Sequence, residues 1–209
     1  MPSTELTELP ALLGILDLAG IAIFALSGAL LAARLGQTFV TLSFFAVITG
    51  VGGGSVRDLL IGAPVFWIHD PWVAPVCLCV ALLVWFTPHR LWDGKLLEWA
   101  DAVGLSAYAV LGTAKALSYG VAPVTAALMG VISGCVGGVI RDVLAGRPSI
   151  IMRPELYVTA AALSAALCAA GTELGLTGWI VWLASAGAGF CLRGAAIHWG
   201  LGLPAYRHR

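Results

Sequence analysis

The sequence predicts an all-α membrane protein with seven transmembrane helices, arranged as two inverted three-helix repeats plus a seventh helix. Three observations predict this fold. Of the 209 residues, 60% are hydrophobic and only 11% are charged, which is too few charges for the surface of a soluble domain. Apolar stretches of bilayer-spanning length follow one another along the chain. The first part of the sequence also aligns with the second part.

Charges, glycines and prolines separate seven apolar stretches, and roughly 20 such residues cross the hydrocarbon core as a helix. The predicted spans are 12–33, 38–62, 72–87, 97–118, 122–146, 156–171 and 176–192. Their connections are too short for a soluble domain. The predicted units are a first three-helix repeat at 12–95, an inverted three-helix repeat at 96–174, a seventh transmembrane helix at 175–194 and a cytoplasmic tail at 195–209.

Basic residues lie mainly on one side of the predicted spans. Arg34, Lys95, Arg147 and Arg193 follow the first, third, fifth and seventh spans, whereas the other connections have almost no Lys or Arg. Basic loops stay in the cytoplasm, so we expect the C-terminus inside and the N-terminus outside. The net charge is zero and no basic tract is present, which argues against nucleic acid as a partner.

An internal repeat appears when the chain is shifted by 84 residues. The matching residues are mostly glycines and charges, which chance does not easily produce. Asp17 aligns with Asp101, Gly53-Gly54 with Gly137-Gly138, and Arg57-Asp58 with Arg141-Asp142. Each copy holds three spans, an odd number, so the second copy enters the membrane upside down. This predicts a pseudo-two-fold axis in the membrane plane, as in many transport proteins.

Glycines gather in the middle of the second and fifth spans, although glycine costs about 1 kcal/mol relative to alanine in a helix. One interpretation is a kink or break that turns backbone carbonyls and half-helix ends toward an ion. The other is close helix packing. Adjacent glycines favour the kink, because packing needs glycine at four-residue spacing. The candidate pore or kink residues are Gly50, Gly52, Gly53, Gly54, Gly134, Gly137 and Gly138.

Charged side chains inside apolar spans are expensive in lipid and face a cavity or a partner. Neighbouring helical residues point about 100° apart, so we expect neither arginine to be neutralised by the aspartate that follows it. Depth in the membrane instead predicts the pairs Asp17–Arg57 and Asp101–Arg141. Whether they line a path or clamp helices is left open. The candidate pore-lining or paired charges are Asp17, Arg57, Asp58, Asp101, Lys115, Arg141 and Asp142.

Lys115 breaks the repeat, because its counterpart in the first copy is Leu31. Two interpretations are open: a pore-facing group, or an anchor that snorkels to the interface. No Cys/His ligand spacing, HExxH or Ser/His constellation occurs, so the sequence predicts neither a metal site nor an enzyme.

With its two GG-x-x-RD motifs, Gly53 to Asp58 and Gly137 to Asp142, the chain resembles the trimeric intracellular cation channel family in its bacterial form. Some bacterial members carry the label of a putative glycine-transporter repeat domain. The resemblance implies a homotrimer among membrane lipids in the plasma (inner) membrane, a pore inside each protomer, potassium as the permeant ion and no cofactor. Animal members have Lys-Glu-Val in the fourth span, where this chain has Lys115-Ala-Leu.

Two functions fit these features. The first is a potassium-permeable channel for monovalent cations. The alternative is a secondary transporter of a small zwitterion such as glycine, because half-helix ends suit both a carboxylate and an amine.

Overall fold

The computed structural model describes residues 5–92, 94–176 and 178–204, without the side chains of residues 5–16, 89 and 90. Within these ranges the chain forms seven α-helices and three short 3-10 helices, which agrees with the all-α prediction. The α-helices are α1 Glu5–Arg34, α2 Phe39–Leu60, α3 Val73–Phe86, α4 Leu96–Ser118, α5 Pro123–Leu144, α6 Val158–Glu173 and α7 Trp179–Trp199, and the 3-10 helices are η1 Phe66–Ile68, η2 His89–Trp92 and η3 Ile150–Met152. The end of the predicted tail, residues 205–209, lies outside the described residues.

Among the described residues, four helical segments are long and apolar enough to cross a membrane: Asp17–Arg34, α2, α5 and α7. Helices α3 and α6 are apolar but have only 14 and 16 residues, fewer than the roughly 20 of a full span. Helix α4 has 23 residues, and it carries Glu98, Asp101 and Lys115. Many large side chains on the outer surface are apolar, as lipid contact requires.

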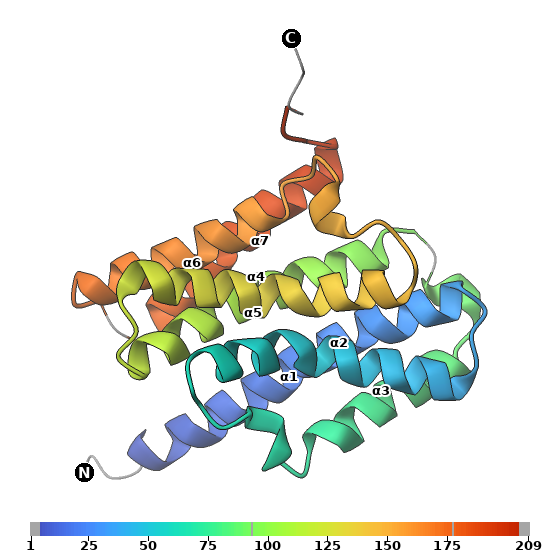
Figure 1. The fold of residues 1–209 in the computed structure, drawn as a ribbon, viewed down its shortest axis with the longest axis horizontal. Coiled ribbons are helices and arrows are strands. Elements are labelled where there is room, and N and C mark those ends of the chain that lie inside the picture. The colour runs from blue at the N-terminus through green and yellow to red at the C-terminus, as the bar shows by residue number, and fades with distance from the viewer. Residues whose placement is uncertain (1–4, 93, 177, 205–209) are drawn as a thin grey trace.

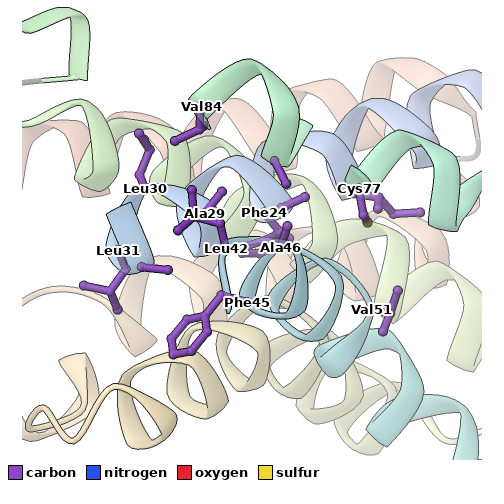
Figure 2. Close-up of a cluster of buried hydrophobic side chains, with 14 of the residues drawn as sticks. Phe24, Ala29, Leu30, Leu31, Leu42, Phe45, Ala46, Val51, Cys77 and Val84 are labelled. Atoms are coloured by element: carbon purple, nitrogen blue, oxygen red, sulfur yellow. The ribbon is translucent and has the colours of Figure 1, made fainter. Parts of the chain in front are cut away.

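The two halves of the chain occupy different parts of the molecule (Figure 1). Helices α1 to α3 form one bundle, and α4 to α7 form the other. Helices α2 and α5 pack against each other and run in opposite directions across the centre of the view. Each half has its own buried apolar cluster. Figure 2 shows the first cluster, to which α1 contributes Phe24, α2 contributes Leu42 and Phe45, and α3 contributes Cys77 and Val84.

Several repeated glycines end helices. Gly36 follows α1 with a φ of 65°, and its repeat counterpart Gly120 follows α4 with a φ of 77°. Gly62 and Gly146 follow α2 and α5 with φ values of 69° and 63°. A positive φ strains any residue with a Cβ, and glycine is the usual residue just past a helix end. These matches in the self-alignment therefore mark equivalent helix ends.

Two sequence predictions about helices need correction. The prediction of a helix break at the mid-span glycines is wrong, because α2 and α5 continue as α-helices through these residues. The glycines instead permit close contact: a Cβ at Gly137 would lie 2.6 Å from the carbonyl oxygen of Thr49. Helix α7 runs on to Trp199, so the predicted end of that span at 192 is too early. Arg193, expected beyond the span, is buried inside the helix.

Candidate functional site

The helices at the centre of the molecule meet through reciprocal contacts. A Cβ at Gly53 would overlap the carbonyl oxygen of Ser133, and a Cβ at Gly137 would crowd the carbonyl oxygen of Thr49. Gly53 corresponds to Gly137 in the repeat, and Thr49 corresponds to Ser133. The same pair of contacts is therefore made twice, with the roles of α2 and α5 exchanged, as across a two-fold axis.

Helices α1 and α4 meet in the same reciprocal way. A Cβ at Gly104 would lie 3.0 Å from the Phe24 ring, and a Cβ at Gly20 would lie 2.5 Å from the Tyr108 ring. Phe24 and Tyr108 are repeat counterparts, and their ring centroids are 5.3 Å apart in an edge-to-face arrangement. Their position between α1 and α4 marks the same axis.

The Asp58 cluster consists of Arg57 and Asp58 at the end of α2, Phe66 of η1 and Lys115 of α4. Asp58 is fully buried. Its Oδ1 accepts a hydrogen bond from Arg57 Nε at 2.8 Å and forms an ion pair with Lys115 Nζ, also at 2.8 Å. Its Oδ2 accepts a hydrogen bond from the backbone N–H of Phe66 at 3.0 Å. Both cations also lie over the Phe66 ring, about 6.0 Å and 5.9 Å from its centroid. One buried carboxylate thus holds two cations and the segment that follows α2.

The Asp142 cluster consists of Arg141 and Asp142 at the end of α5, Ser27 of α1, Asp101 of α4 and Ile150 of η3. Arg141 Nε donates to Asp142 Oδ1 at 2.9 Å, while Nη1 donates to Asp101 Oδ1 at 2.9 Å and to Ser27 Oγ at 2.6 Å. Asp142 Oδ2 accepts from the backbone N–H of Ile150 at 2.9 Å. Ile150 is the repeat counterpart of Phe66, so the two clusters are built on the same plan.

The structure confirms one predicted pair and overturns the other. Asp101 and Arg141 form an ion pair at 2.9 Å. Among the described residues Asp17 forms no ion pair with Arg57; instead its backbone carbonyl accepts a hydrogen bond from the Tyr108 hydroxyl at 3.1 Å. The expectation that neither arginine pairs with the next residue is also wrong, because Arg57–Asp58 and Arg141–Asp142 are ion pairs at 2.8 Å and 2.9 Å.

The contact of Lys115 argues against the interpretation as an interface anchor. Its ammonium lies 2.8 Å from the Asp58 carboxylate, and its side chain is 27% exposed. An anchor at the membrane interface would extend toward water. Lys115 therefore joins α4 to α2 and does not snorkel.

The remaining candidate glycines also lie at close contacts. In α2, a Cβ at Gly50 would lie 3.2 Å from Ile21, one at Gly52 would lie 3.1 Å from Ile140, and one at Gly54 would lie 2.5 Å from the Phe66 ring. In α5, a Cβ at Gly134 would lie 2.7 Å from the carbonyl oxygen of Leu105, and one at Gly138 would lie 2.8 Å from the Tyr157 hydroxyl. Because these glycines have no side chain, the helices and both charge clusters can lie close together.

A cavity of about 120 Å³ adjoins the Asp142 cluster. Its wall includes the carboxylates of Glu98, Asp101 and Asp142 and the apolar side chains of Leu31 and Ile150. Arg34, Arg147 and Arg153 also line it, and all three are exposed at the surface. Arg141, which is buried, lines the cavity as well, so the buried part holds both signs of charge and the rim is basic.

Sequence reasoning missed one buried charge, which lies outside the two clusters. Arg193 is 1% exposed, pairs with Glu155 at 2.7 Å and lies 5.3 Å from the centroid of the Tyr157 ring. This contact fastens α7 to the segment between α5 and α6. The apolar run from Gly194 to Trp199 beyond Arg193 was the signal that the helix continues.

The fold and its paired clusters define a polytopic helical membrane protein containing two copies of one three-helix unit. The family profile described as "Glycine transporter" matches the chain twice, at residues 14–89 and 98–173. The two matches begin 84 residues apart, the shift that aligns the sequence with itself. The chain belongs to this glycine transporter family, also designated UPF0126.

Individual relatives extend this likeness over most of the chain. A UPF0126 membrane protein of Vibrio cholerae is 37% identical over 202 residues, covering 94% of this chain and 83% of that protein. The UPF0126 inner membrane protein YadS of Escherichia coli K12 is 37% identical over 203 residues, covering 91% and 94%. A solved structure of the TRIC trimeric intracellular cation channel orthologue from Rhodobacter sphaeroides has a TM-score of 0.82 at 40% identity, covering 90% and 97%. The resemblance seen in the doubled GG-x-x-RD motif is thereby confirmed.

Proposed function

We propose that this protein is a potassium-permeable channel for monovalent cations, with a pore inside each protomer of a homotrimer. The observation that carries the proposal is a set of buried polar side chains on helices α1, α2, α4 and α5. These are Ser27, Thr49, Arg57, Asp58, Asp101, Ser106, Thr113, Ser133, Arg141 and Asp142. Polar groups are expensive inside a membrane, and there they pair with one another or mark the paths of substrates and ions.

The proposed topology is seven spans with the second three-helix unit inverted. The opposite directions of α2 and α5 and the reciprocal contacts at Gly53 and Gly137 support it. The basic residues in the connections favour the N-terminus outside and the C-terminus in the cytoplasm. The inner membrane is the proposed location, because the E. coli relative is named as an inner membrane protein. No cofactor other than the permeant ion is needed for this function.

The proposed path lies between the two charge clusters, on either side of the α2–α5 crossing. The candidate glycines let α2 and α5 lie close together there, and the backbone carbonyls of Thr49 and Ser133 lie at this contact, while their buried side chains lie against Gly28 of α1 and Gly112 of α4. Hydroxyl and carbonyl oxygens replace part of the hydration shell of a passing cation.

Selectivity for cations follows from how the buried basic groups are held. Arg57, Lys115 and Arg141 each bind a carboxylate at 2.8 to 2.9 Å, and an opposite charge at this distance cancels most of the repulsion that a bare cation would meet. Structural relatives named as trimeric cation channels support both the ion type and the trimer. They do not favour the alternative of a zwitterion transporter.

Recordings in planar lipid bilayers test the proposal. Purified protein should give discrete current steps in KCl. Under a KCl gradient the reversal potential should lie close to the potassium equilibrium potential. Saturable uptake of labelled glycine into proteoliposomes, without current steps, would instead establish the transporter. Native mass spectrometry of the same preparation should give the mass of three chains.

A further inference from the structure

Two polar atoms in one buried place lack hydrogen-bond partners. They are Oδ2 of Asp101 and the hydroxyl of Tyr157, and within the described part of the chain no group meets hydrogen-bond geometry with either atom. Asp101 is 2% exposed and Tyr157 is 1% exposed, so bulk water does not reach them. A buried polar atom without a partner is unfavourable, and a charged one more so.

Gly138 shows how close the two groups lie. A Cβ on this glycine would lie 2.8 Å from the Tyr157 hydroxyl, 3.4 Å from Asp101 Oδ1 and 3.7 Å from Arg141 Nη2. The phenol, the carboxylate and the guanidinium thus meet over the space that the glycine leaves open. An ionised carboxylate oxygen only accepts hydrogen bonds, whereas a tyrosine hydroxyl can donate one. The two unpaired atoms are therefore chemically complementary.

The ring of Tyr157 is held by a helix outside the repeat. The guanidinium of Arg193 in α7 lies over this ring, 5.3 Å from its centroid, and such a contact attracts the cation to the aromatic face. Arg193 in turn binds the Glu155 carboxylate at 2.7 Å, and the backbone N–H of Tyr157 donates to the Glu155 carbonyl at 2.8 Å. The repeat counterpart of Tyr157 is Val73, so the first half has no phenol at this position.

We propose that Tyr157 is a positioning residue for the buried charge pair, and that its hydroxyl donates to Asp101 Oδ2. Asp101 Oδ1 already accepts from Arg141 Nη1 at 2.9 Å, so each carboxylate oxygen then has its own donor. This arrangement keeps the carboxylate charged and against Arg141. Tyr157 touches no passing ion and acts through Asp101.

The inference rests on the proposed channel function and deepens it by naming a residue that sets ion selectivity. Asp101 and Asp142 both bind the single guanidinium of Arg141, so the three side chains together carry one net negative charge. A net negative charge beside the path favours cations over anions. Tyr157 stabilises that charge.

Tyr108 provides a matched control. It is as buried as Tyr157, at 2% exposed, but its hydroxyl donates to the backbone carbonyl of Asp17 at 3.1 Å. Asp17 forms no ion pair among the described residues, so Tyr108→Phe removes a buried hydroxyl and leaves every buried charge pair in place.

Reversal potentials in planar bilayers under a KCl gradient test the role in selectivity. Tyr157→Phe keeps the ring and removes the donor, so the carboxylate loses its charge or turns away from Arg141. We expect the potassium-to-chloride permeability ratio to fall by about twofold or more, and to stay unchanged in Tyr108→Phe. An unchanged ratio in Tyr157→Phe, or an equal fall in Tyr108→Phe, would overturn the proposal.

Thermal unfolding in detergent tests the same contact without any current. Tyr157→Phe should lower the midpoint temperature. In an Asp101→Asn background the same change should lower it by about half as much or less, because a hydrogen bond to a charged acceptor is roughly twice as strong as one to a neutral acceptor. Tyr108→Phe should cost the same in both backgrounds.

The two measurements separate this proposal from the channel itself. Equal midpoint losses for Tyr157→Phe in both backgrounds would overturn the contact, whatever the currents show. If the natural protein gives no current, the channel is overturned and the midpoint temperatures still decide whether Tyr157 binds Asp101. If Asp101→Asn does not fold, the permeability ratios of the two tyrosine variants decide.

Discussion

Arg57 and Arg141 each bind the aspartate that follows them in the sequence, although neighbouring helical positions point in different directions. The long arginine side chain can fold back along the helix, and its planar fork offers several donors at once. This freedom is why depth in the membrane correctly predicted Asp101–Arg141 but not a pair between Asp17 and Arg57. The backbone positions determine which carboxylates are within reach of an arginine, and the side-chain rotamer determines which of them the arginine binds.

The unequal roles of Asp101 and Asp17 predict unequal effects on stability. Asp101→Asn removes a buried ion pair with Arg141, so we expect the free energy of unfolding to fall by about 2 kcal/mol. Asp17→Asn, at the equivalent repeat position, should cost less than about 1 kcal/mol. Thermal or denaturant unfolding of the detergent-solubilised protein measures both. Equal losses would contradict the assigned contacts.

Lys115 should influence the current through its charge. Lys115→Met leaves Asp58 with Arg57 alone, and a unit charge about 10 Å from the path is worth roughly 0.4 kcal/mol in water. We therefore expect single-channel potassium conductance to rise by about twofold. Lys115→Arg keeps the charge and serves as the control. A lower conductance in Lys115→Met with a normal Lys115→Arg would show that the ammonium helps conduction instead.

At the scale of helices, the number and order of the elements followed from hydropathy, because every span is an apolar run bounded by charges or glycines. The function of the mid-span glycines did not follow from the sequence, because a cluster of glycines is compatible with both a broken helix and a close helix crossing. Only the neighbouring helix decides between them. Helices α2 and α5 continue through the glycines, which excludes a break, and a Cβ at Gly137 would lie 2.6 Å from the Thr49 carbonyl oxygen, as close packing requires.

The crossing of α2 and α5 gives a direct test of these glycines. Gly137→Ala places a methyl group against the Thr49 carbonyl, and overpacking of this kind should lower the free energy of unfolding by about 1 to 3 kcal/mol. Gly187 in α7 is the matched control, because a Cβ there meets no atom within 4 Å among the described residues. Gly187→Ala should be neutral or stabilise the helix by up to about 1 kcal/mol. Thermal unfolding in detergent compares the two, and equal destabilisation would argue against the tight crossing.

At the scale of the whole molecule, the sequence predicted two related units because glycines and charges repeat at a fixed shift. It could not predict that Lys115 of α4 binds Asp58 of α2, or that Arg193 of α7 binds Glu155. Both contacts join segments that are far apart in the chain. The first contact depends on how the two bundles dock and the second on how α7 packs within its own bundle, and hydropathy encodes neither. The cavity beside Asp142 arises from the same docking.

The central claim is that ions cross the molecule between its two related halves, past Thr49 and Ser133. The most direct measurement is the potassium current of a Thr49→Cys variant, made in a background where the natural cysteines are replaced by serine or alanine. A positively charged, water-soluble thiol reagent should react with this cysteine and block the current, while the parent without Thr49→Cys should be unaffected. If the current persists unchanged although mass spectrometry shows full modification at position 49, ions do not pass this point and the account is wrong.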